Sequence, residues 1–442
     1  MYPNLYYVFK DWFGVEWKAL AFLNTFGLMV AIGFVVAAFF ISQELKRKEK
    51  LGLLHPREEL IYVGKPASVI DLLINFILGF IFGYKLSGLF FGIPEGMSPQ
   101  EFIFSSEGNV LGGIVLGSVL AFSKWYEKNK QKLKVPEQRS IRIWPHDRVG
   151  DIVIIALVSG IIGAKLFDNF ENWDEFIAHP IERLFSASGL TFYGGLILAT
   201  ISLLWYGKRK GINLFHLADA IAPAMLIAYA VGRIGCQVSG DGDWGIYNSA
   251  YITDSDGKLV EAKAGDFNTQ LKKYDTYFLK GAVTDSSGMT HYVTDRVSKT
   301  LEEVPNMSVV APSFLPLWMV AYNYPNNVNN DGIALSNCEG DYCGVLPVAV
   351  FPTPFYETVL STLLFLFVWS IRKRIKTPGY IFSIYLILNG LERFIIEKIR
   401  VNFRYNVLGF NLSQAEIIAL LLILAGIILI FIFKKRQNYL TE

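Results

Sequence analysis

The sequence is poor in charge. Of its 442 residues only 18% are Asp, Glu, Lys or Arg, whereas 52% are hydrophobic and 15% are aromatic. Soluble globular proteins carry about 25% charged residues, so the shortfall indicates a chain that folds in lipid. The formal net charge is only +2, which argues against the strongly basic surface of a nucleic-acid-binding protein. We therefore expect a membrane protein that binds no nucleic acid.

Cysteine and histidine are also scarce. The three cysteines and five histidines form no cluster at metal-ligand spacing, so we expect neither a metal nor a cofactor. Cys338 and Cys343 either form a disulfide, which an oxidising compartment permits, or remain free thiols in a loop. The first residues lack the basic region and short apolar core of a cleavable signal peptide, so we expect the first apolar run to be a membrane span.

Long apolar runs, in contrast, are abundant. The first, at 19–41, has 23 residues, and a helix of this length reaches about 34 Å, enough to cross a hydrocarbon core of roughly 30 Å. Helices and closed barrels alone satisfy their backbone hydrogen bonds in lipid. We predict an all-α polytopic membrane protein with about nine transmembrane helices. The other eight are predicted at 68–92, 108–123, 149–168, 189–206, 214–236, 354–371, 379–400 and 412–433.

Lys and Arg cluster in alternate gaps between these spans. The clusters lie at 46–48, 124–142, 208–210, 372–374 and 434–436. Basic residues are enriched in cytoplasmic loops, so the pattern predicts an outer N-terminus and a cytoplasmic C-terminus. The long polar gap at 240–346 is then an inserted outer, periplasmic cap. Its short apolar stretches and frequent turn signals favour a β-rich or irregular structure.

Two stretches of the chain resemble each other. Residues 71–86 align with 151–166 and share Asp and Gly-x-Lys-Leu, and residues 109–116 align with 191–198 and share Gly-Gly. Chance similarity between apolar helices is the alternative explanation. The matched polar residues and glycines favour a helical hairpin duplicated in tandem and in the same orientation.

These features divide the chain into five parts. The parts are an N-terminal outer segment with the first span and a basic cytoplasmic loop (1–67), the extra hairpin with its basic loop (68–145), core spans four to six (146–239), the outer soluble cap (240–346) and core spans seven to nine (347–442).

Ionisable side chains gather near the outer ends of the spans, where burial in lipid is costly and usually marks function. Arg233 ends the sixth span, and the spacing of Arg393, Glu397 and Arg400 places them on one face of the eighth. The alternatives are a self-neutralising pair of Arg393 with Glu397 and snorkelling of Arg400 to headgroups. A basic set drawn from several helices favours a phosphate-binding site instead, because guanidinium binds phosphate bidentately.

Glycines accompany these charges. Five lie within 232–245, two of them flanking Arg233, and Gly194 and Gly195 follow Tyr193 at the start of the fifth span. Glycine lets backbone approach a ligand closely, and lipid tolerates an irregular helix end only beside protein or a polar cavity. We therefore expect both glycine-rich segments to border the site.

In combination these residues resemble the motifs of the bacterial phosphatidylglycerol–prolipoprotein diacylglyceryl transferase family. Residues 232–245 resemble its Gly-Arg-x-Gly signature, and 191–196 its His-Gly-Gly-Leu motif. Residues 352–357 resemble its Pro-x-x-x-Tyr-Glu motif, and 389–400 its Tyr-Gly-x-x-Arg-x-x-x-Glu-x-x-Arg helix. Residues 26–29 resemble its first-span motif. The resemblance covers spans one and four to nine, and the extra hairpin and the cap are additions to the usual seven-span plan.

The resemblance implies transfer of the diacylglyceryl group of phosphatidylglycerol to the lipobox cysteine thiol of prolipoproteins, the first step of lipoprotein maturation. It implies a site in the bacterial cytoplasmic (inner) membrane that faces the outer leaflet. The implied partners are phosphatidylglycerol, prolipoprotein signal peptides and the bilayer. The residues implied in catalysis are Arg393, Glu397, Arg400 and Tyr193. Those implied in binding phosphatidylglycerol are Arg233, Gly194, Gly195, Asp241 and Tyr356.

The sequence departs from the family at four positions. Phe26 stands for a tyrosine, Tyr193 for the histidine, Cys236 for an asparagine and Asn389 for a tyrosine. Tyrosine, with a pKa near 10, is a poor base at neutral pH, and the acceptor thiol could instead ionise beside the cationic cluster, so the general base stays open. A catalytically altered phospholipid-binding or transporter-like relative is the alternative function, and an assembly scaffold a third.

Overall fold

The computed structural model describes the chain except for a set of short segments. These are 92–101, 104, 186–188, 190, 243, 279–282, 285–289, 292–300, 336–337, 339, 403, 408 and 442. The chain forms two compact units. The first comprises Met1–Val15, Leu23–Phe40 and Ala218–Glu442, and the second comprises Glu16–Phe22 and Ile41–Leu217.

The protein is a mostly helical, polytopic membrane protein, as predicted. Within the described part of the chain, six helices are long and apolar enough to cross a membrane. They are α2 (Thr25–Lys50), α3 (Val69–Phe91), α6 (Val149–Glu171), α10 (Leu214–Ser239), α13 (Thr353–Ile371) and α15 (Gln414–Thr441). The other three predicted spans overlap α5 (Val110–Lys130), α9 (Phe192–Lys210) and α14 (Tyr380–Glu397). The total of nine spans stays a prediction.

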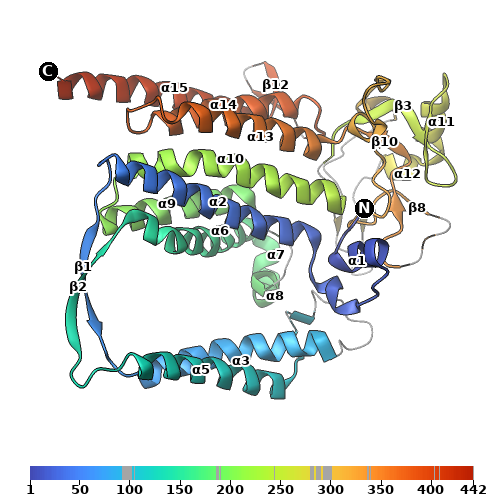
Figure 1. The fold of residues 1–442 in the computed structure, drawn as a ribbon. Helices are drawn as coiled ribbons and strands as arrows, with labels where there is room; N and C mark the ends of the chain where they lie inside the picture. Colours follow the sequence, from blue (N-terminus) through green and yellow to red (C-terminus); the bar gives the residue numbers. More distant parts are fainter. Residues whose placement is uncertain are drawn as a thin grey trace. The chain divides into compact units, whose positions relative to one another are not determined.

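In the first unit, α13, α14 and α15 pack side by side (Figure 1). Asp219 of α10 fixes the start of α14, because its carboxylate accepts hydrogen bonds from the backbone N–H groups of Gly379 (2.9 Å) and Phe382 (3.0 Å). An anion at a helix N-terminus also interacts favourably with the helix dipole. Close contacts at Gly390 and Gly426 bring α14 and α15 together. These contacts set the direction of the helix that carries Arg393 and Glu397.

The segment between α10 and α13 contains the predicted strands, together with short helices. Strands β10 (Val348–Val350), β3 (Tyr247–Thr253) and β4 (Leu259–Glu261) form an antiparallel sheet, and β7 (Asn306–Met307) pairs with β3 in parallel. The remaining elements are α11 (Asp266–Lys273), α12 (Asp275–Phe278), β5 (Val283–Thr284), β6 (Thr290–His291), β8 (Ile333–Ala334) and β9 (Gly344–Val345). Cys338 and Cys343 form a disulfide, which decides between the two alternatives left open above.

Short elements complete both units. The first unit also contains α1 (Leu5–Phe13) and the hairpin of β11 (Arg404–Val407) and β12 (Phe410–Ser413). In the second unit, β1 (Arg57–Val63) pairs antiparallel with β2 (Glu137–Ile143) (Figure 1). Leu60 lies opposite Ser140. The helices α7 (Trp173–Ala178) and α8 (Pro180–Phe185) follow α6.

The second unit contains two helical hairpins, α3 with α5 and α6 with α9, which repeat the same contacts as tandem duplication predicts. A Cβ added at Gly83 would lie 2.3 Å from the carbonyl oxygen of Gly112, and one at Gly163 would lie 2.4 Å from that of Gly194. The loops also match, since Asn109 N–H donates to Tyr84 O (2.9 Å) and Thr191 N–H to Ala164 O (3.1 Å). Small residues let neighbouring membrane helices approach closely.

This packing predicts opposite outcomes for two glycines of α6. We expect Gly163→Ala to destabilise the protein by about 1–3 kcal/mol, because the added methyl group meets backbone that cannot move aside. At Gly160 a Cβ would have no neighbour within 4 Å, so Gly160→Ala should be neutral or slightly stabilising, since Ala is the better helix former. Thermal unfolding of the two purified variants in detergent checks the difference. Equal destabilisation would contradict this packing of α6 against α9.

Candidate active site

The buried carboxylate of Glu357, in the first turns of α13, is the centre of the candidate site. Its side chain is fully inaccessible to solvent. It forms an ion pair with Arg233 of α10, and its Oε1 lies 3.2 Å from Arg393 Nη1 and 3.5 Å from Arg400 Nη1. The hydroxyl of Tyr229 donates to the same oxygen at 3.0 Å. Three predicted arginines from different parts of the chain thus meet at one carboxylate.

Arg393 links this carboxylate to a second one. Its Nη2 lies 3.2 Å from Oε2 of Glu397, one turn later on α14. The side chain of Glu397 is 1% exposed and also accepts a hydrogen bond from Asn402. The predicted pair of Arg393 and Glu397 therefore forms, but it belongs to a larger network. Glu392, also buried, lies within electrostatic range of the same arginines.

Arg400 reaches the cluster from beyond a helix end. The eighth span was expected to continue to residue 400, but α14 ends at Glu397. Backbone pairing explains the early end, because Ile246 N–H donates to Ile399 O (2.8 Å) and Gly245 forms an isolated bridge with Arg400. A Cβ at Gly245 would lie 2.7 Å from the carbonyl oxygen of Ile399. Glycine at this position therefore permits the approach that directs Arg400 towards Glu357.

Arg233 is held within α10. It is 8% exposed, and its Nη1 lies 3.5 Å from the sulfur of buried Cys236. Cys236 thus provides a hydrogen-bonding side chain one turn away, at the position where the resembling family has asparagine. The neighbouring Gly235 allows α2 to approach, since a Cβ there would lie 2.9 Å from Met29 Cβ. Of the three arginine side chains, that of Arg393 is the most exposed, at 26%, against 9% for Arg233 and 11% for Arg400.

The remaining predicted residues make other contacts. The hydroxyl of Tyr356 donates to Met319 O (2.8 Å) and so holds the polar insertion against α13. The backbone N–H of Asp241 donates to Cys236 O (3.1 Å) at the end of α10. Tyr193, Gly194 and Gly195 begin α9 in the second unit. Both glycines contact α6, so helix packing accounts for the need for glycine at these positions. Their role in lipid binding stays a prediction.

Glu357 and Tyr229 were missed by the sequence reasoning. Glu357 closes the motif at 352–357, and a carboxylate in an apolar span requires a cationic partner. The rule therefore predicts a cationic partner for Glu357 but does not indicate which arginine it is. Tyr229 precedes Arg233 by four residues and therefore shares its helix face.

Comparisons with known proteins point to a single family. The family model described as prolipoprotein diacylglyceryl transferase matches residues 110–432. The phosphatidylglycerol–prolipoprotein diacylglyceryl transferase of Clostridium novyi is 24% identical over 76% of this chain and 95% of its own length. That of Dehalococcoides mccartyi strain BAV1 is 25% identical over 67% and 81%. The protein of the same name from Leptospira interrogans (strain Fiocruz L1-130) is 32% identical over 23% of this chain, and the match spans only 39% of that relative.

Proposed function

Because the chain belongs to the prolipoprotein diacylglyceryl transferase family, whose model matches residues 110–432, we propose that it transfers a diacylglyceryl group from phosphatidylglycerol to the lipobox cysteine thiol of prolipoproteins. This reaction is the first step of bacterial lipoprotein maturation. The observation that carries the proposal is the meeting of Arg233, Arg393 and Arg400 around the buried carboxylate of Glu357. Such a cluster suits a lipid phosphate, because guanidinium groups bind phosphate bidentately and remain charged.

The arginines stabilise the leaving group, glycerol phosphate. The thiolate of the acceptor attacks the glyceryl carbon that carries the phosphate ester. The C–S bond forms as the C–O bond breaks, and the bonding electrons pass to the oxygen of the departing glycerol phosphate. Arg393 and Arg400 stabilise this developing charge, while Arg233 binds the headgroup. Glu357 and Glu397 position the guanidinium groups through the ion pairs described above.

The proposed topology has nine spans, with the N-terminus and the 240–346 cap outside and the C-terminus in the cytoplasm. The alternating basic clusters support it, and so does the disulfide of Cys338 and Cys343, because disulfides persist on the oxidising side of the bacterial inner membrane. The site then faces the outer leaflet of the cytoplasmic membrane, where the signal peptides of prolipoproteins present their cysteines.

Two experiments test the function. The protein should restore growth of a bacterium depleted of its own transferase. The purified protein in detergent should also convert a lipobox peptide and phosphatidylglycerol to the thioether. A phospholipid-binding relative without the chemistry would retain phosphatidylglycerol but yield no thioether, and that result would overturn the proposal.

Two catalytic roles are open to Tyr193, at the start of α9: hydrogen-bond donor and general base. We propose that it donates a hydrogen bond that orients the headgroup, while the arginines favour ionisation of the acceptor thiol. Tyr193→Phe should then slow turnover about ten- to a hundredfold, the cost of one hydrogen bond to a charged group. Loss of a general base would cost about a hundred- to ten-thousandfold and remove an ionisation from the pH–rate profile. The profile of Tyr193→Phe with a lipobox peptide decides between the two roles.

The matched control is Tyr206→Phe, which removes a hydroxyl from the other end of α9. That hydroxyl donates to Asp151 at 2.5 Å, so the substitution changes helix packing and leaves the proposed chemistry unchanged. A shift of the pH–rate profile in Tyr193→Phe but not in Tyr206→Phe would contradict the orienting role.

A further inference from the structure

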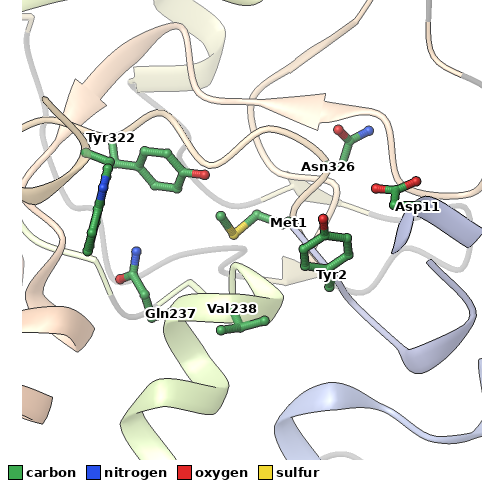
Figure 2. A pocket seen from close by; sticks show the side chains of 8 residues that line it. Met1, Tyr2, Asp11, Gln237, Val238, Tyr322 and Asn326 are labelled. Atoms are coloured by element: carbon green, nitrogen blue, oxygen red, sulfur yellow. The ribbon is translucent and has the colours of Figure 1, made fainter. Parts of the chain in front are cut away.

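A cavity of about 450 Å³ lies in the first unit, at the end of α10. Three parts of the chain line it, namely the N-terminal segment with Tyr2 and Asp11, the last turn of α10 with Gln237, and the inserted segment with Trp318, Tyr322 and Asn326. In Figure 2 the side chains of Tyr322, Gln237 and Tyr2 surround that of Met1, and Asn326 and Asp11 lie beyond Tyr2. The proposed chemistry does not use this cavity.

The cavity adjoins the arginine cluster. Gln237 follows Arg233 by four residues, so it lies about 6 Å farther along the same face of α10. The insertion that lines the cavity is held against α13 directly beside Glu357. The ring of Trp318 packs on that of Phe355, with centroids 4.9 Å apart, and the hydroxyl of Tyr356 donates to Met319 O. A substrate that leaves the cluster along α10 would therefore enter the cavity.

The chemistry of the wall suits a polypeptide better than a lipid phosphate. Tyr324 donates to Oε1 of Gln237, and Nδ2 of Asn326 donates to Tyr342 O. The amide N–H groups of Gln237 can therefore donate to a peptide backbone, and the side-chain oxygen of Asn326 can accept from it. The hydroxyls of Tyr2 and Tyr322 add further donors. Among the residues that the structure describes, the lining of the cavity includes no Lys or Arg, and Asp11 would repel an anion. The amino group of Met1 donates to Pro325 O at 3.0 Å, and burial lowers its pKa, an effect that Asp11 opposes.

We propose that this cavity binds the polypeptide of the acceptor immediately beyond its lipobox cysteine, an inference that rests on the proposed function. When the cysteine thiol lies at the arginine cluster, an extended chain advances about 3.3 Å per residue, so its second or third following residue reaches Gln237. The cavity thereby makes binding of the protein substrate depend on residues outside the signal peptide.

The disulfide loop supports two walls of this cavity. Asn326 Nδ2 donates to Tyr342 O at 2.8 Å, inside the loop closed by Cys338 and Cys343. The ring of Tyr7 in α1 packs on that of Tyr342, with centroids 5.7 Å apart, and its hydroxyl accepts a hydrogen bond from Asp341 N–H at 3.3 Å. The loop thus connects the inserted wall to the N-terminal wall and keeps the cavity formed before substrate binds.

The test compares two lipobox peptides, one ending at an amidated cysteine and one continuing for four residues. We expect the longer peptide to have a KM about tenfold lower, the value of roughly one or two net hydrogen bonds. Val238→Trp, which adds an indole to the wall of the cavity in the last turn of α10, should remove this difference and leave the KM for phosphatidylglycerol unchanged. Val260→Trp on the exposed face of β4 is the control, and it should keep the tenfold difference.

A second measurement does not depend on the folding of Val238→Trp. A benzophenone side chain at the third position after the cysteine should cross-link the peptide to residues 318–326 of the wild-type protein. Equal KM values for the two peptides with the wild-type protein, or cross-links confined to other segments, would overturn the proposed cavity while thioether still forms. Absence of thioether with every peptide would instead overturn the proposed function.

Discussion

Glu357→Gln is expected to lower transfer by about a hundred- to five-thousandfold, because removing one partner of a buried ion pair costs about 3–5 kcal/mol. Arg233, Arg393 and Arg400 all lie against this carboxylate, so its neutralisation leaves three guanidinium groups without their common counter-ion. Mutual repulsion should then separate them. The amide keeps the shape of the side chain and can still accept the hydrogen bond from Tyr229. The substitution therefore removes the charge without changing the volume of the side chain.

The matched control is Glu416→Gln. Glu416 is also fully buried in a spanning helix, and its Oε1 lies 2.5 Å from Lys398 Nζ. The side chain of Lys398 is 48% exposed, so water can solvate its charge once the partner is lost. We expect Glu416→Gln to keep transfer within a few-fold. Initial rates at equal amounts of folded protein, judged by thermal unfolding in detergent, provide the comparison. Similar losses in the two variants would mean that Glu357 supports the fold and not the chemistry.

The arginine cluster was largely predictable from the sequence, whereas its counter-ion was not. Charge in an apolar span and the spacing of Arg393, Glu397 and Arg400 are local signals, and a helix face follows from them directly. Glu357 belongs to another helix, and only the packing of α13 against α10 and α14 brings it to the arginines. Tyr356 illustrates the same limit, because its hydroxyl binds a carbonyl 37 residues earlier in the chain.

The end of a helix was predicted well where the chain becomes polar at the residue at which the helix stops. It was predicted less well where the helix continues into polar sequence. The span predicted at 354–371 agrees with α13, which covers Thr353–Ile371. The first span was predicted at 19–41, whereas α2 covers Thr25–Lys50. Residues 44–50 are mainly Glu, Lys and Arg, which are good helix formers and continue the helix beyond its apolar part. Hydropathy predicts which part of a helix lies in lipid, whereas helix propensity decides at which residue the helix ends.

Arg233→Ala should fail to complement, because transfer becomes too slow to support growth. Two charge-assisted hydrogen bonds to a phosphate contribute about 3–6 kcal/mol, which corresponds to a hundred- to ten-thousandfold in rate. Arg233→Lys restores the charge. However, its ammonium group lacks the planar fork that binds phosphate bidentately. Its single nitrogen also cannot reach both Glu357 and Cys236. We expect it to recover at most one of the two bonds and to remain about ten- to a hundredfold slow.

Arg139→Ala controls for the loss of an arginine from an ion pair. Arg139 lies in β2 of the second unit, where its Nη2 lies 2.7 Å from Glu137 Oε2, and the two side chains are 56% and 57% exposed. Exposed pairs of this kind contribute about 0–1 kcal/mol, so this variant should complement. Membrane abundance measured by immunoblot separates lost chemistry from lost protein. If Arg233→Ala complemented at normal abundance, the lipid phosphate would have to bind at Arg393, the most exposed of the three guanidinium groups, and Arg233 would serve only to neutralise Glu357.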